Sequence, residues 1–330
     1  MHPCFWQERK VRRLTCDLVS KAAQMDACTD TLIRNMRIDE RIMVLTADLV
    51  GSCRLNKIEL EFPDRFINVG IAEQNMMGIA AGLAREGMLP FVFSFSVFTS
   101  LRAADQLRTD IFYNGLNVKV VGTHSGVSTG QAGSTHFSLE DVGVVRSMPK
   151  SKIIVPADAV STGKAVEALL RLKEPAYLRL DRNPLPVLYE QMDEFQIGKG
   201  IVLQTGKRRA VISMGSMVAV AKAAAKIVFK STGEKIAVID MHTVKPIDKD
   251  LVRLYSTCCS QIYTLEEHNI YGGLGSAVAE IIAGEGQPCR LYRLGIQDDY
   301  PKGGPVEAVR ARLGLEAKQI ADIIIESGEG

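Results

Sequence analysis

Short apolar runs alternate with helical segments along most of the chain, and this alternation restricts the fold more than any other feature. Runs rich in Val, Ile and Phe, such as "RIMVLTAD", "LPFVFSF" and "VKVVGTH", are typical of buried strands. Helical segments such as 72–86 and 97–113 stand between them. Apolar strands separated by helices indicate a parallel sheet covered on both faces. The sequence therefore predicts a doubly wound α/β fold.

An irregular stretch divides this pattern into two parts. "NPLPVLYEQMDEFQIGKG" contains two prolines and two glycines and has no clean period, so we place a domain boundary near residues 184–196. We expect a first α/β domain over residues 1–190, beginning with an amphipathic helical arm over residues 1–30. A smaller α/β domain follows over residues 191–330, with "RAVISMGS", "KIAVIDMHT" and "QIYTLEEH" as strands.

The composition excludes several classes of protein. The formal net charge of +2 is too small to indicate a nucleic-acid or membrane partner. No apolar run reaches the roughly 18 residues of a membrane span, and the start lacks a signal-peptide core. The cysteines are scattered, odd in number and without zinc spacing, so we expect no disulfide framework and no metal site. They are typical of reduced thiols in a cytoplasmic protein; these residues are Cys4, Cys16, Cys28, Cys53, Cys258, Cys259 and Cys289.

Chemistry-bearing side chains cluster in the loops that follow the predicted strands. Loops at the carboxyl ends of parallel strands form the ligand crevice of such sheets. Glu73 taken alone is typical of an acid that favours the positive end of a helix dipole. An acid, two phenylalanines, two histidines and an arginine on neighbouring loops favour a functional site instead. The loops are Asp48–Ser52, Gly70–Glu73, Ser94–Phe98, His124–His136 and Asp181–Arg182.

One motif is rejected. "YGGLGSAVAE" follows a strand and opens a helix, as a dinucleotide fingerprint does, but Val278 stands where Gly or Ala is needed. No phosphate loop of the GxxxxGK[ST] type occurs. We interpret these glycines as a tight strand-to-helix turn with a helix start that favours an anion.

Six blocks of sequence, in order, resemble the C-terminal half of transketolase, and more closely the small subunit of split bacterial transketolases. The likeness runs from about residue 25 to the end. The blocks are "TADLVGS", "FINVGIAEQNMMGIAAGLA", "DRNPLPVL", "MHTVKPID", "EEHNIYGGLGSAVAE" and "GIQDDYPKGG". The resemblance implies a pyrimidine-binding domain followed by a transketolase C-terminal domain, and a ketol transferase of carbohydrate metabolism.

The resemblance also implies a thiamine diphosphate site. Glu73 matches the glutamate that hydrogen-bonds the ring nitrogen N1′ and so promotes deprotonation of the thiazolium carbon C2, chemistry that belongs to the cofactor. Phe95 and Phe98 match the aromatic pocket for the pyrimidine ring, and Asp48 matches an acid close to the cofactor. Leu101 stands where full-length enzymes often have a tyrosine.

The sugar-binding positions match unevenly. Ser52, His124 and Arg182 match groups that hold the terminal phosphate of the sugar. His136, in "STH", matches a catalytic histidine that contacts hydroxyls near the reacting carbons.

Two positions depart from the family pattern. Met25 replaces a phosphate-binding arginine, for which a partner subunit or Arg54 could substitute, and Ala132 replaces an acid that reads a donor hydroxyl. The resemblance therefore implies an anionic sugar but leaves open whether its anion is phosphate or sulfonate.

A partner subunit is implied by what the chain lacks. The other half of transketolase carries a GDG motif that holds Mg²⁺ and the diphosphate, and no GDG occurs here. We expect an enzyme active only with a large subunit, in a heterotetramer of two small and two large subunits. Two alternatives stay open: the β component of a 2-oxo acid dehydrogenase, and a non-catalytic paralogue that scaffolds a partner.

Overall fold

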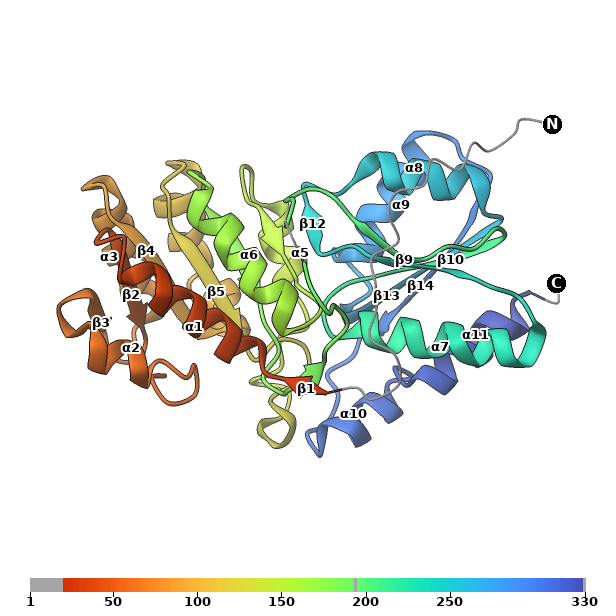
Figure 1. Cartoon of the computed structure of the whole chain (residues 1–330), viewed down its shortest axis with the longest axis horizontal. Helices are drawn as coiled ribbons and strands as arrows, with labels where there is room; N and C mark the ends of the chain where they lie inside the picture. The colour runs from red at the N-terminus through yellow and green to blue at the C-terminus, as the bar shows by residue number, and fades with distance from the viewer. Residues whose placement is uncertain (1–19, 193–194, 329–330) are drawn as a thin grey trace.

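The computed structural model describes residues 20–192 and 195–328, and its two main sheets lie side by side (Figure 1). The first sheet has seven strands in the order β12-β6-β7-β5-β4-β2-β3, all parallel except β12, which is antiparallel to β6. Its central strands are buried along their whole length, as the continuous apolar runs predict. The strands are β2 (Ile42–Thr46), β3 (Phe66–Asn68), β4 (Leu89–Phe95), β5 (Lys119–Thr123), β6 (Ile153–Ile154), β7 (Ala176–Arg179) and β12 (Thr243–Lys245).

Helices cover both faces of this sheet. α1 (Gln24–Met36) packs against α6 (Ala159–Arg171) on one face, in front of the strands in Figure 1. α3 (Glu73–Arg85), the helical segment 98–113 and α5 (Asp141–Ser147) share a separate apolar core on the other. The carboxylate of Asp158 accepts a hydrogen bond from the amide of Ser161 and caps α6. The short helix α2 (Asn56–Glu61) follows the first loop.

The second sheet has five strands in the order β14-β13-β10-β11-β9, with β9 antiparallel to β11. One core contains residues of α7 and α11, and the other contains residues of α8 and α9. Its strands are β9 (Ile201–Gln204), β10 (Arg209–Ser213), β11 (Ala237–Asp240), β13 (Gln261–Asn269) and β14 (Arg290–Ile296). Its helices are α7 (Met217–Thr232), α8 (Lys249–Cys258), α9 (Leu274–Gly284), α10 (Val306–Arg312) and α11 (Ala317–Glu326).

The two halves of the chain are interlocked. Each of the two apolar cores includes residues of both sheets. In addition, β12 comes from the second half but completes the edge of the first sheet, where the amide of Val155 donates to the carbonyl of His242 over 2.8 Å. The α/β class of both halves is confirmed. The division into residues 1–190 and 191–330 stays a prediction.

Two local predictions differ from the structure. Residues 20–23 are not helical: β1 (Lys21–Ala22) pairs with β8 (Leu185–Pro186), and α1 begins only at Gln24. The pairing to β8 takes up backbone groups that a helix would use, and the rest of the predicted arm, residues 1–19, lies outside the described residues. The segment 97–113 is helical as predicted, but residues 98–102 and 107–113 form wider π-helical turns.

The five cysteines of the described residues are free thiols. Within the same residues there is no grouping of three potential metal ligands, and no helix combines the length and apolar character that crossing a membrane requires.

Candidate functional site

The predicted site loops meet at one edge of the first sheet. Strands β7, β5, β4, β2 and β3 are consecutive neighbours, so their carboxyl ends lie along a single edge. The side-chain oxygen of Asn68 accepts hydrogen bonds from the amides of Asp48 (3.0 Å) and Gly70 (3.1 Å), which ties two of the loops together. Cys53 follows Ser52 in the sequence, and Thr123 precedes His124. The Cys53 thiol lies 3.5 Å from the Thr123 hydroxyl, so these two loops also meet. The loops predicted to converge do so.

Glu73 is the first residue of α3, but its carboxylate does not face solvent. The residue is only 2% exposed. One carboxylate oxygen lies 2.9 Å from the Arg102 guanidinium, and the other accepts a longer hydrogen bond of 3.4 Å from the Ser94 hydroxyl. A helix-start acid that acts only through the dipole has no need of burial, because the dipole effect operates at exposed positions. Burial with an arginine partner indicates a more specific role.

The aromatic side chains next to Glu73 form a compact cluster. The rings of Phe95 and Phe98 stack with centroids 5.7 Å apart and an angle of 15° between their planes. His124 stacks on Phe95 at 3.9 Å, and His136 meets Phe98 edge-on at 5.6 Å. The ring nitrogen Nδ1 of His136 lies 3.0 Å from the Thr135 hydroxyl, which constrains the orientation of the ring. The structure therefore brings together the predicted acid, both phenylalanines and both histidines.

Arg102 belongs to the same cluster, although no sequence motif singles it out. Its guanidinium carbon lies 4.0 Å from the centroid of the Phe98 ring, a cation–π contact, while the same group binds Glu73. The amide of Ala103 donates to the carbonyl of Phe98 over 3.1 Å, a π-helical bond across five residues. Such π-helical turns are frequent at functional sites. The four-residue spacing from Phe98 is the one signal that could have identified Arg102.

His124 is a buried, neutral histidine. It is 4% exposed, and its backbone has a positive φ of 58°. Burial lowers its pKa from 6.5 to about 4, and the nearby Arg182 guanidinium acts on the pKa in the same direction. At neutral pH, the His124 ring is therefore uncharged. Arg182 lies on an exposed part of the next loop, with a nitrogen 3.5 Å from the Thr129 carbonyl.

The positions that depart from the family pattern differ in their burial. Met25 is 3% exposed and belongs to an apolar core. Arg54, with a positive φ of 56°, forms an ion pair with Asp26, the residue after Met25. The Arg54 guanidinium therefore contacts the residue that follows Met25, the position where the family has its arginine. Leu101 and Ala132 are both exposed.

Residues of the second half bind the site loops through hydrogen bonds and ion pairs. One carboxylate oxygen of Glu267 accepts a hydrogen bond of 2.9 Å from the amide of Val127, in the loop between the two site histidines. Arg310 donates to Glu267 over 2.6 Å and to Asp181 over 3.1 Å. Burial raises the pKa of Asp181 to about 6, against the opposing effect of the Arg310 charge. These contacts attach the loop that follows His124, and Asp181 next to Arg182, to the second half of the chain.

The glycine turn in "YGGLGSAVAE", rejected above as a dinucleotide motif, binds a side chain of this chain. The carboxylate of Glu266 accepts hydrogen bonds of 2.7 Å from the amides of both Leu274 and Gly275 at the start of α9. The amides at this helix start therefore donate to a side chain of the protein, and burial raises the pKa of that Glu266 side chain to about 7. A Cβ atom on Gly273 would lie 2.0 Å from the same carboxylate, which explains the glycine.

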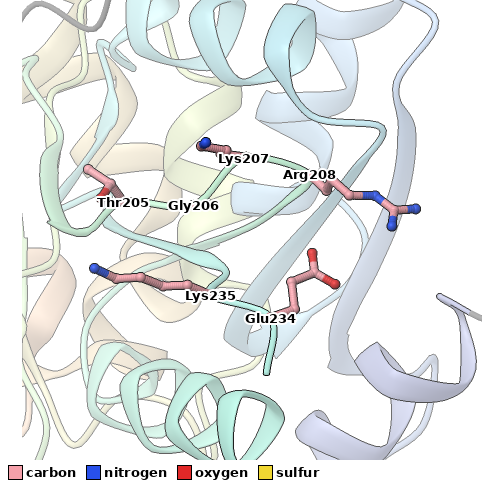
Figure 2. A pocket seen from close by; sticks show the side chains of 6 residues that line it. All are labelled: Thr205, Gly206, Lys207, Arg208, Glu234 and Lys235. Atoms are coloured by element: carbon pink, nitrogen blue, oxygen red, sulfur yellow. The ribbon is translucent and has the colours of Figure 1, made fainter. Parts of the chain in front are cut away.

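A separate hollow lies at the second sheet (Figure 2). Its volume is about 430 Å³. In Figure 2 the side chains of Lys207 and Lys235 extend to the left, and that of Arg208 extends to the right. Glu234, at its border, forms a two-point ion pair with Arg209. The hollow contains none of the predicted site residues, so it does not belong to the candidate site. It is lined by Thr205, Gly206, Lys207, Arg208, Glu234 and Lys235.

Comparisons with known proteins agree on one family. Residues 20–187 match the family described as "Transketolase, pyrimidine binding domain", and residues 198–320 match "Transketolase, C-terminal domain". The 6-deoxy-6-sulfo-D-fructose transketolase subunit SqwH of Clostridium sp. (strain MSTE9) is 37% identical, over 89% of this chain and 91% of its own. An apulose-4-phosphate transketolase subunit of Phocaeicola vulgatus is 36% identical, over 92% and 98%. A solved structure titled "Split gene transketolase, inactive beta4 tetramer" has a TM-score of 0.84 and 34% identity, over 93% and 98% of the two chains.

Proposed function

Because the chain belongs to the transketolase family, we propose that it is the small subunit of a split, thiamine-diphosphate-dependent transketolase that transfers a two-carbon ketol unit from a ketose to an aldose. The observation that carries the proposal is Glu73, a buried carboxylate beside stacked phenylalanine rings at the edge of the pyrimidine-domain sheet. The two similar subunits support it, because each matches this chain over nearly its full length and is described as a transketolase subunit.

The residues present fit an aminopyrimidine ring. The Arg102 guanidinium is a flat group with N–H donors, and it lies both on Phe98 and against Glu73. An aminopyrimidine ring whose N1′ carries a proton has the same requirements, a ring to stack on and a buried carboxylate to accept that hydrogen. When bound, thiamine diphosphate supplies the nucleophilic carbon of the reaction. Glu73 would hold the proton at N1′, while Phe95 and Phe98 orient the ring, with Asp48 close to the cofactor.

We assign the remaining site residues to the sugar. His136 lies edge-on to the Phe98 ring and would contact hydroxyls near the reacting carbons. Ser52, His124 and Arg182 would receive the anionic end. Because His124 is neutral, Arg182 supplies positive charge there and His124 contributes a hydrogen bond. The similar subunits are named for a sulfonated and a phosphorylated sugar, so both anions are candidates.

We assign the diphosphate and Mg²⁺ to a large subunit, because the GDG motif is absent from this chain. The solved relative is titled as an inactive tetramer of β chains, in line with a small subunit that is inactive by itself. A cytoplasmic heterotetramer of two small and two large subunits is the assembly we propose.

Glu73→Gln tests this function in the complex with a large subunit. The amide still fits the buried site but cannot share a proton with N1′, so we predict an intact complex whose kcat falls by about 100-fold or more, the usual range for loss of an acid–base group. Exchange of the cofactor C2 proton, followed by NMR, should slow in parallel. The control is Glu59→Gln, which removes an exposed acid from α2. Activity of Glu73→Gln within threefold of wild type, as a rough limit, would reduce Glu73 to a helix-start acid.

A further inference from the structure

Arg102 makes the two contacts that the proposed function gives to the cofactor ring. Its guanidinium donates to the Glu73 carboxylate over 2.9 Å, and its central carbon lies 4.0 Å from the centroid of Phe98. We propose that Arg102 is a placeholder: it occupies the aminopyrimidine position in the chain without cofactor and is displaced when thiamine diphosphate binds. This inference rests on the proposed function and deepens it.

The two groups cannot share the position. Stacked aromatic rings have centroids roughly 4.5–7 Å apart, and the guanidinium already lies within this space over Phe98. One carboxylate oxygen of Glu73 is taken by Arg102, and the other faces the Ser94 hydroxyl at 3.4 Å. A ring that donates to Glu73 and stacks on Phe98 therefore requires the guanidinium to leave.

The Glu73 carboxylate has a hydrogen-bond donor both before and after the cofactor ring replaces Arg102. A buried carboxylate without a partner is strongly unfavourable, so a chain without cofactor needs a donor at this place. The guanidinium meets the need because it is planar, always charged and able to stack on a ring. When the cofactor ring donates instead, the Arg102 side chain, which is already 45% exposed, can turn to solvent. Arg102 and the ring are thus alternative partners of the same carboxylate.

The placeholder has a measurable consequence for affinity. Since the state that can bind is only a fraction of the population, the apparent Kd is raised by the inverse of that fraction. Removing the guanidinium should therefore tighten cofactor binding. An arginine that stayed beside the bound ring and supported Glu73 would have the opposite effect.

The test is calorimetric titration of thiamine diphosphate with Mg²⁺ into the complex of this chain with a large subunit. Arg102→Met and Arg102→Gln should each lower the Kd by about 10-fold, the factor expected when a tenth of the molecules are open. Arg108→Met is the control, because it removes an exposed arginine from the same helical segment, and its Kd should equal that of wild type. A Kd that is unchanged or higher in both Arg102 variants overturns the placeholder.

The chain alone supplies a second readout that needs no cofactor. Arg102→Met should lower the urea midpoint of wild type but shift it much less in a Glu73→Gln background, because the pair is then already broken. Equal shifts in both backgrounds would show that Arg102 and Glu73 do not interact, and the inference would fall while the proposed function stands. If no complex binds thiamine diphosphate, the proposed function and the placeholder fall together.

Discussion

At the scale of single residues, the proposed chemistry depends on a few side chains whose environments differ sharply. Glu73 is buried with a cationic partner, His124 is buried and neutral, and Arg182 is exposed. An exposed arginine keeps its charge and can reach an anion without a large desolvation cost. In the proposed function, the anionic end of the substrate would therefore depend mainly on Arg182, with His124 as an uncharged donor.

Arg182→Ala should raise the Michaelis constant for an anionic acceptor by about 10-fold or more and change kcat by less than about threefold. A charge-assisted contact contributes roughly 1.5–3 kcal/mol, and a group remote from the reacting carbons binds ground state and transition state alike. Steady-state kinetics of the assembled complex with neutral, phosphorylated and sulfonated sugars measures this effect. Arg171→Ala, an exposed change at the end of α6, is the control. Equal use of neutral and anionic sugars by wild type and Arg182→Ala would exclude an anion pocket.

The sequence predicted that the loops carrying these residues meet at one edge of the sheet, because loops that follow parallel strands leave from the carboxyl ends of those strands. It could not locate Arg102. An arginine four residues after a phenylalanine is common on helices, and only the fold shows that a buried acid from 29 residues earlier meets its guanidinium. The sequence also could not predict that His124 is neutral, because its lowered pKa depends on burial and on the nearby Arg182.

At the scale of elements, the loop between the two site histidines is shaped by its glycines and anchored by β13. Gly126 has a φ of +59°, and a Cβ atom at this position would lie 2.4 Å from the Glu267 carboxylate. That carboxylate accepts the amide hydrogen of Val127. The loop can therefore approach Glu267 only because residue 126 has no side chain. Alternating strands and helices predict that a loop exists here, but they do not predict this anchor.

Gly126→Ala should destabilise the chain by about 2 kcal/mol or more, because it combines an unfavourable φ with a clash against a buried acid. Urea unfolding followed by circular dichroism gives the value. Gly284→Ala serves as the comparison, since a Cβ there meets nothing within 4 Å and its φ is not in the left-handed region. We expect it to be neutral or slightly stabilising. Equal stability of the two variants would contradict the anchoring of the loop by Glu267.

At the scale of the whole molecule, the two halves are joined by shared cores and by a buried ion network. Apolar patterning predicted two α/β units, and it could not show that β12 of the second half completes the first sheet, because a three-residue edge strand carries almost no periodic signal. Arg310 extends from α10 to Glu267 and Asp181, both nearly fully buried. The C-terminal half thus holds the site loops in place.

Arg310→Met should therefore destabilise the chain by about 3–5 kcal/mol, the range for breaking a buried ion pair and leaving a charge unpaired. Equilibrium unfolding in urea measures the change, and Arg312→Met on the exposed side of α10 is the matched control. A loss below about 1 kcal/mol, the level of a surface ion pair, would mean that the network contributes little to joining the halves.

The measurement that tests the central claim most directly is the binding of thiamine diphosphate with Mg²⁺ to this chain, alone and mixed with a large transketolase subunit, by calorimetry. A small subunit that carries the pyrimidine site but lacks the GDG motif should give no measurable heat alone. The mixture should bind one cofactor per pair of subunits and gain ketol transfer activity. Tight, Mg²⁺-dependent binding by the chain alone would contradict the split-enzyme account.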